Sequence, residues 1–346
     1  MNNNNNTEEI IMNKLTKIGA SALCGSLVAV SAAHAGSLSV AGSATATWNK
    51  DEGEVTGNPL GMNSGMTFTG TGELDDGSTV TLTLTQADQT AYSAGSITWA
   101  IPGLGTLGLD QSGSGLDRID DMMPTAWEET NGTGLNTGLA TVAGVGGSTN
   151  IEWTMDSGML PDGVSAHIAY TPRATGNFAN DKSAGGAGNS VGGSGYDIVI
   201  QHSGLMDGLN VFGGISHIDQ TADSAARDDD REQYALGFTY ATGAITVGMQ
   251  VSKDDMNAVT GTQAYDNLAY GISFAVNDDL TISYGRHEST AESKDTAEVD
   301  NEAESFQLSY SMGGASIKVA ESSVDNAKYS SANDWDGTTV ALSLAF

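Results

Sequence analysis

The sequence is poor in cysteine, in basic residues and in proline, and each shortage narrows the class of protein. Cys24 is the only cysteine, so no disulfide bond within the chain holds the fold together. Lysine and arginine number 13 against 43 aspartate and glutamate residues, a formal net charge of -30. Nucleic-acid partners require a basic surface, and this balance excludes them. Glycine is abundant while proline is scarce, with 45 and 5 residues, which favours packed strands joined by tight turns.

Long apolar runs are also missing after residue 35, so a membrane-spanning helix of about 20 residues is not expected there. The apolar run Ile18 to Val30 follows the basic stretch Asn13 to Lys17 and precedes Ala33-His34-Ala35. This order is typical of a cleaved export signal. We predict that residues 1–35 are a leader and signal peptide, removed after Ala35, and that residues 36–346 form one domain. A transmembrane anchor is the alternative, but the run is too short for it.

The dominant positive signal is alternation of apolar and polar residues. In Thr338 to Phe346, the residues Val340, Leu342, Leu344 and Phe346 fall on one face, and small or hydroxyl residues fall on the other. A period of two predicts a strand with one apolar face. A tilted strand of about 9 residues crosses the apolar part of a bilayer. The stretch therefore predicts one strand of a transmembrane β-barrel.

The same alternation recurs sixteen times, which predicts an all-β protein with a sixteen-stranded antiparallel barrel. The predicted outward residues run at every second position from Leu38 to Trp48, Met66 to Leu74, Val80 to Leu84, Ile97 to Ile101, Leu107 to Leu109, Ile151 to Met155, Val164 to Tyr170, Tyr196 to Ile200, Leu209 to Ile215, Tyr234 to Tyr240, Ile245 to Val251, Leu268 to Phe274, Leu280 to Tyr284, Phe306 to Met312, Ala315 to Val319 and Val340 to Phe346. Aromatic residues gather near the predicted strand ends, as in the interface girdles of membrane barrels. A soluble β-sandwich is the alternative interpretation.

The predicted connections alternate between short and long. Short ones such as Asp75 to Ser78 and Ala241 to Gly243 have turn chemistry. Long ones are Asn49 to Gly65, Gln86 to Gly95, Gln111 to Gly147, Pro172 to Gly195, Asp219 to Arg231, Lys253 to Gln263, Glu288 to Glu302 and Ser322 to Gly337. Short turns at one rim and long loops at the other are typical of outer-membrane barrels.

The export signal, the sixteen strands, the long third loop and the terminal Phe346 together resemble the Gram-negative general porin family, particularly its alphaproteobacterial type. The resemblance covers residues 36–346 and depends on pattern rather than on a diagnostic motif. It implies a homotrimer of water-filled channels in the outer membrane, surrounded by lipid, each narrowed by a third loop folded into the lumen. It also implies that the last strand, ending at Phe346, is recognised by the barrel assembly machinery.

Within the third loop, apolar residues alternate irregularly with acids, and Ile119, Met122, Met123 and Trp127 suit a short helical turn against a surface. The resemblance implies that this loop forms the pore constriction, with the candidate residues Asp117, Arg118, Asp120, Asp121, Glu128 and Glu129. A solvated acidic loop at the rim is the alternative.

The predicted inward residues of the first strands, such as Thr67, Thr69, Thr79 and Thr81, carry hydroxyls and no basic group. The resemblance would place arginines there, so this chain departs from it. Lys318, inward by parity, is the nearest basic candidate and completes the predicted constriction. A hydroxyl wall facing acids predicts a passive channel that prefers cations, since rings of acids select cations.

Two further surfaces follow from the pattern. The outward positions Gly42, Ala44, Ala46, Gly70 and Gly72 are small, which predicts close packing between subunits. Acidic runs in the long loops, such as Asp228 to Asp230 and Glu298 to Glu302, offer oxygen ligands for Ca²⁺. None of the runs has the spacing of an EF-hand, so we favour solvated charge and expect no cofactor.

Enzymatic activity has little support in the sequence. Gly188 to Gly192 fits the G-x-S-x-G pattern, but no strand-to-helix turn surrounds it. The histidines His167, His202, His217 and His287 are on separate predicted strands without metal-ligand spacing. The sequence therefore predicts a diffusion channel and no catalytic or metal site. A substrate-selective channel, a barrel enzyme and a surface adhesion protein are the alternatives.

Overall fold

The computed structural model describes residues 36–52, 57–88, 94–110, 113–132, 134–174, 192–220 and 227–346. The predicted leader and signal peptide, residues 1–35, lie outside the described residues, as does most of the Gly188 to Gly192 pattern. In the part of the chain that the structure describes, no helix is both long and apolar enough to span a membrane. The helices there are the 3-10 helices η1 (Gly115–Ile119), η2 (Thr130–Gly132), η3 (Ser157–Met159) and η4 (Ala327–Tyr329).

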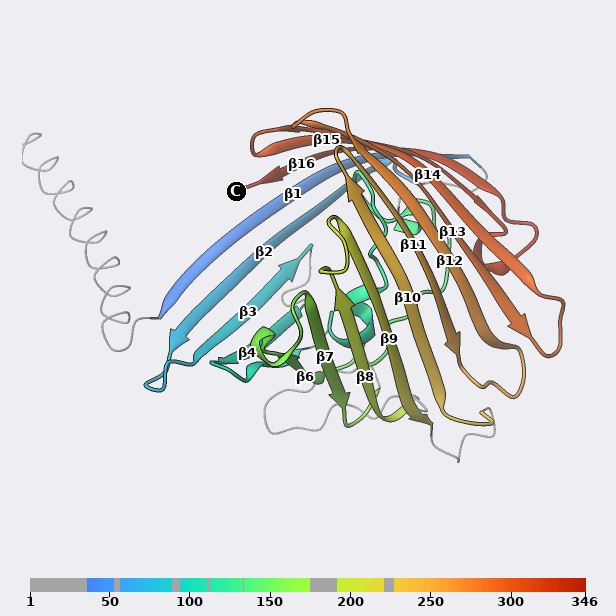
Figure 1. Ribbon diagram of the computed structural model, residues 1–346. Helices are drawn as coiled ribbons and strands as arrows, with labels where there is room; N and C mark the ends of the chain where they lie inside the picture. The colour runs from blue at the N-terminus through green and yellow to red at the C-terminus, as the bar shows by residue number, and fades with distance from the viewer. Residues whose placement is uncertain are drawn as a thin grey trace, which may run out of the picture.

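The sixteen strands of these residues form one closed antiparallel barrel (Figure 1). Each strand pairs with its neighbours along the chain, and β1 closes the barrel on β16. Their bounds are β1 Ser37–Glu52, β2 Leu60–Glu73, β3 Thr79–Ala87, β4 Ala94–Ile101, β5 Gly105–Asp110, β6 Asn150–Met155, β7 Val164–Thr171, β8 Gly192–His202, β9 Leu209–Gln220, β10 Arg231–Thr242, β11 Ile245–Asp255, β12 Thr262–Ala275, β13 Leu280–Ser293, β14 Val299–Met312, β15 Ala315–Asp325 and β16 Trp335–Ala345. The predicted strand number and barrel are confirmed.

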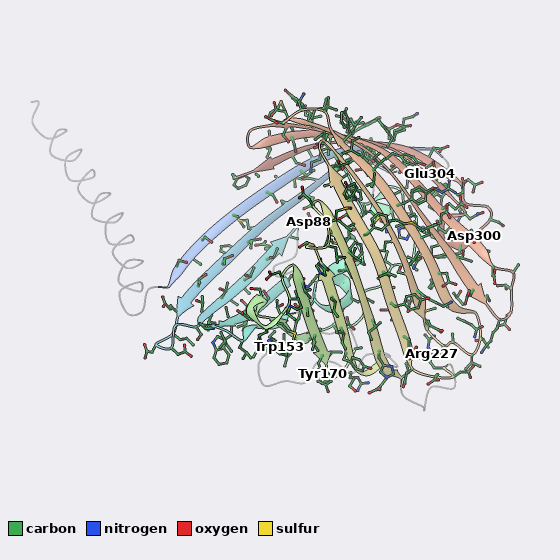
Figure 2. All side chains as sticks on the ribbon, viewed as in Figure 1. Asp88, Trp153, Tyr170, Arg227, Asp300 and Glu304 are labelled. Atoms are coloured by element: carbon green, nitrogen blue, oxygen red, sulfur yellow. The ribbon has the colours of Figure 1, made fainter. Side chains whose placement is uncertain are left out.

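Alternation explains why these segments form a barrel. In β10, the side chains of Tyr234, Leu236 and Phe238 are exposed on the outside, whereas Gln233 and Ala235, at alternate positions, are buried. Only a closed sheet satisfies every backbone group inside a membrane while one face contacts lipid and the other lines an interior. Figure 2 shows side chains along both faces of the strands.

The strands extend further than predicted at the long-loop end, so several predicted loops were too long. The connection predicted for Glu288 to Glu302 is shorter, because β13 continues to Ser293 and β14 begins at Val299. Backbone pairing there continues beyond the apolar band, and the outward positions become charged. The Arg286 guanidinium contacts the carboxylates of Glu288, at 2.6 Å, and of Glu302, at 2.5 Å. The apolar alternation marked only the part of each strand whose outward side chains are apolar.

Polar and apolar residues also fill part of the barrel interior, where residues between β5 and β6 pack against the wall. Leu116 and Ile119 are fully buried beside Val199 and Phe212 of the wall strands. A second cluster joins Leu135 to Ala303, Val324, Ala327 and Trp335. Burying these side chains removes apolar surface from water and holds the segment inside the barrel.

Candidate functional site: a segment inside the barrel

The residues between β5 and β6 form the candidate site. We call residues 113–149, described except for residue 133, the inner segment. Its hydrogen bonds go to inward-facing side chains on both sides of the barrel: Glu152 and Asp197 on β6 and β8, Gln250 on β11, and Ser283, Asn301 and Gln307 on β13 and β14. The inner segment therefore crosses the interior from one wall to the other.

Two buried acids anchor the ends of the inner segment near β6 and β8. The Leu116 N–H donates to Asp197 Oδ2 at 2.7 Å, and the Val145 N–H donates to the same oxygen at 3.0 Å. The Gly115 N–H donates to Glu152 Oε2 at 2.7 Å. The Asp197 carboxylate thus joins residues 29 positions apart in the chain. A charged acceptor forms stronger hydrogen bonds than a neutral one.

Glycine is required where the inner segment touches Asp197. Gly115 has φ +61° and Gly144 has φ +56°, both in the left-handed region. A Cβ at Gly115 would lie 2.2 Å from Asp197 Oδ2, and one at Gly144 would lie 2.1 Å from it. Conformation and close approach therefore both exclude side chains at these two positions.

On the opposite wall, amide side chains of β14 hold the inner segment. Gln307 Oε1 accepts from the N–H groups of Trp127 and Glu128 at 3.0 and 3.1 Å, and its Nε2 donates to Glu128 O at 2.8 Å. Asn301 Nδ2 donates to Thr137 O at 2.8 Å. These bonds fix the backbone position of the acidic stretch that contains Glu128 and Glu129.

The acids predicted for the constriction all lie on the inner segment. Asp121 is exposed, and Asp117, Asp120, Glu128 and Glu129 are partly buried. Asp120, Asp121 and Glu129 line a common cavity. The helical turn predicted around Ile119 to Trp127 is observed earlier, as η1.

Crowding of these acids changes their protonation. Burial, and then the nearby carboxylates of Asp117, Asp121 and Glu129, raise the pKa of Asp120 to about 8. Burial and the neighbouring acids also raise the pKa of Glu129. Burial raises the pKa of Glu128, although Lys318 opposes that change. The charge of Asp120 therefore depends on pH in the neutral range.

The predicted basic residues occupy different surroundings. The Arg118 guanidinium pairs with the Glu152 carboxylate, so its charge is compensated. Lys318 lies on the inward face of β15, and its Nζ is 5.8 Å from the centre of the Trp127 ring. In the described parts of β1 to β5, no lysine or arginine takes an inward position.

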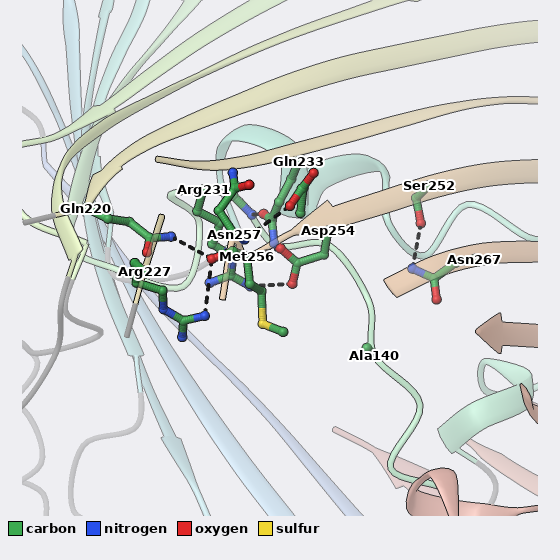
Figure 3. A network of polar contacts seen from close by, with 12 residues as sticks. Ala140, Gln220, Arg227, Arg231, Gln233, Ser252, Asp254, Met256, Asn257 and Asn267 are labelled. Atoms are coloured by element: carbon green, nitrogen blue, oxygen red, sulfur yellow. Dashed lines mark hydrogen bonds and ion pairs between the residues drawn. The ribbon is translucent and has the colours of Figure 1, made fainter. Parts of the chain in front are cut away.

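One inward ion pair was missed from the sequence. Arg231 at the start of β10 donates to both oxygens of Asp254 on β11, at 2.7 and 2.6 Å (Figure 3). Arg227 and Gln220, nearby in the same view, both donate to Met256 O. The parity of β10 and β11 would have placed Arg231 and Asp254 inward if both strands had been predicted to their full lengths.

Comparison with known proteins gives a consistent result. The model of the Gram-negative porin family matches residues 19–315. OmpF of Salmonella typhi, solved with daunomycin, has a TM-score of 0.66 at 15% identity and covers 89% of this chain and 97% of its own. The anion-selective porin of Comamonas acidovorans has a TM-score of 0.65 at 13% identity, covering 90% and 100%.

The trimer form of OmpT from Vibrio cholerae has a TM-score of 0.62 at 9% identity, covering 90% of this chain and 99% of its own. At such low sequence identities, the structural similarity shows a shared fold. A search of curated proteins finds no match. The family model covers most of the chain and agrees with the closed sixteen-stranded barrel and its polar interior. The chain belongs to the Gram-negative porin family and is an outer-membrane diffusion channel.

Proposed function

We propose that this porin is a water-filled channel for ions and small hydrophilic solutes that prefers cations, and that the inner segment forms its constriction. The supporting observation is the distribution of charge around the inner segment. Asp120, Asp121 and Glu129 line one cavity, whereas the described inward residues of β1 to β5 carry no basic group. Acids grouped along a pore attract cations and repel anions.

Two basic groups near the acids do not offset this charge. Arg118 is paired with Glu152 and Arg231 with Asp254, so each contributes little field beyond its partner. Lys318 lies close enough to Glu128 to oppose the rise in that pKa. The anion-selective Comamonas porin has the same fold, so side chains rather than the fold must decide selectivity.

The reversal potential of the refolded protein in a planar bilayer under a KCl gradient tests this proposal. We expect the sign that corresponds to K⁺ permeation, and a shift toward zero in the combined variant Asp120→Asn, Asp121→Asn and Glu129→Gln. Asp266→Asn on the outward face of β12 is the matched control, because it removes an acid that does not face the lumen. Anion preference in the parent protein would refute the proposal. A saturating block of the current by one solute would instead favour a substrate-selective channel.

We also propose a homotrimer whose contacts use the small outward residues of β1 and β2. A Cβ built at Gly70 or Gly72 meets no atom within 4 Å, so this part of the wall is flat and accessible. Small residues let two walls approach closely in a membrane. Gly70→Trp with Ala44→Trp should dissociate the trimer in native electrophoresis, whereas Val247→Trp on β11 should not. A trimer that persists in the double variant would count against this interface.

The remaining partners are outer-membrane lipid and the barrel assembly machinery. The apolar outward band is the surface that we assign to lipid. Phe346 is 81% exposed although its N–H and C=O both bond to Gly42, so its ring is accessible to a recognition factor. Phe346→Ala should slow insertion into the outer membrane without preventing refolding in detergent. Equal insertion rates would refute this role.

A further inference from the structure

Three ligand groups converge at the long-loop end of the barrel, His217 and Asp219 on β9 and Asp230 just before β10. His217 Nε2 lies 3.5 Å from Asp219 Oδ1 and 3.6 Å from Asp230 Oδ2. One ligand atom of each residue lies within 4.8 Å of a ligand atom of both others. The residues are partly exposed, so an ion from solution can reach them.

Each of the two carboxylates also accepts a hydrogen bond on its other oxygen. The second oxygen of Asp219 accepts from the Ser194 hydroxyl. The second oxygen of Asp230 accepts from the Gln220 N–H at 2.8 Å. One oxygen of each carboxylate therefore remains turned toward His217 Nε2. Metal ligands in proteins are typically oriented by such outer contacts.

Two further groups lie beside the imidazole. His217 Nδ1 lies 3.8 Å from Glu232 Oε1, and the Tyr196 ring lies 5.5 Å from the imidazole, measured between ring centroids. A carboxylate near one ring nitrogen favours a proton there, which leaves the other nitrogen free to bind a metal. This arrangement distinguishes the cluster from an isolated acidic run, where no group directs a nitrogen into the centre.

We propose that His217, Asp219 and Asp230 bind one divalent transition-metal ion of the zinc class, with a fourth position open to water. Metal–ligand distances of about 2.1 Å in tetrahedral geometry give ligand–ligand distances of about 3.4 Å, close to the two histidine–carboxylate separations observed. A nitrogen ligand favours zinc-class ions over Ca²⁺ and Mg²⁺, which prefer oxygen. A bound ion would link the end of β9 to the residue before β10.

The sequence predicted no metal centre, because its histidines lack the spacing of a local motif. The ligands come together only because β9 and β10 pair, with His217 opposite Glu232 in the register. Asp230 belongs to an acidic run that was considered only for Ca²⁺. Among its neighbours, Asp228 pairs with Lys294 at 2.7 Å.

Isothermal titration of the detergent-folded full chain with ZnCl₂, purified without a histidine tag, tests the proposal. We expect one tight equivalent per chain, and a loss of affinity of about tenfold or more in His217→Ala. His202→Ala is the control, because that histidine lies at the end of β8, where its Nδ1 accepts the Gly204 N–H at 2.9 Å. Glu232→Gln should weaken binding about tenfold without abolishing it.

The absorption spectrum of the Co²⁺-loaded protein provides a second measurement. Intense visible bands are expected for the parent protein and should be absent in Asp219→Asn with Asp230→Asn. Circular dichroism checks that every variant retains the barrel. Equal zinc affinity in His217→Ala and the parent protein would overturn the proposal. Displacement of zinc by an equal concentration of CaCl₂ would also overturn it, because that result describes an oxygen-only site.

Discussion

Removing the carboxylate of Asp197 should release the inner segment from the wall while leaving the barrel intact. Asp197 is fully buried and accepts from Leu116 and Val145. A hydrogen bond to a charged group contributes about 1.5–3 kcal/mol, so Asp197→Ala should weaken docking by about 3–6 kcal/mol. Asp197→Asn keeps the volume but loses one acceptor and the charge, so about half of that loss is expected.

Hydrogen exchange read at individual amides measures this effect. A loss of about 3 kcal/mol corresponds to about a hundredfold faster exchange at Leu116 and Val145. Single-channel recordings should show higher conductance with larger fluctuations, because the inner segment then moves within the lumen. Asp266→Ala on the outer face is the control. Unchanged protection at both amides in a folded Asp197→Asn barrel would refute the assignment of Asp197 as the anchor.

Three other predictions follow from the same contacts. Gly144→Ala should destabilise the fold by clearly more than Gly243→Ala, measured by urea unfolding. The two glycines have nearly equal φ, +56° and +58°, but only Gly144 has an atom in the way of a Cβ, so equal losses would contradict the steric argument. The preference for K⁺ over Cl⁻ should rise between pH 6 and pH 9, because Asp120, whose pKa is about 8, gains negative charge as it loses its proton. Reversal potentials should show this rise, Asp120→Asn should reduce it, and a flat profile in the parent would refute it. Arg231→Leu should cost about 3–5 kcal/mol, because Asp254 is only 3% exposed and would lose its partner. Arg231→Leu combined with Asp254→Leu should recover most of that loss in the same unfolding assay, and no recovery would contradict the pairing.

Strand parity was readable from the sequence because outward and inward positions differ in residue type within each strand. Tyr234, Leu236 and Phe238 are exposed as their alternation predicts. Strand ends were less readable. Beyond the apolar band, outward positions such as Arg286 and Glu302 carry charges that compensate across strands, so the pattern of a strand is lost although the backbone ladder continues.

The candidate site was readable only in part. The acids of the inner segment are local in sequence, and their mixture with apolar residues indicated a packed segment. Its anchors carried no comparable signal. Asp197 accepts from the Leu116 N–H, 81 positions away in the chain. Because almost every residue type has a backbone N–H, the sequence does not indicate which residues a buried acid will bind.

By itself, the sequence determined that the chain forms a barrel and which side of each strand faces outward, because a period of two repeats in every strand and separates apolar from polar side chains. Only the tertiary structure decided which charges near the lumen are compensated by a partner of opposite sign. Arg118 and Arg231 acquire carboxylate partners through folding, and His217 meets Asp219 and Asp230 only through the pairing of β9 with β10. Charge compensation depends on distances of a few ångströms, and those distances are set by strand register and by the path of the inner segment rather than by any local pattern.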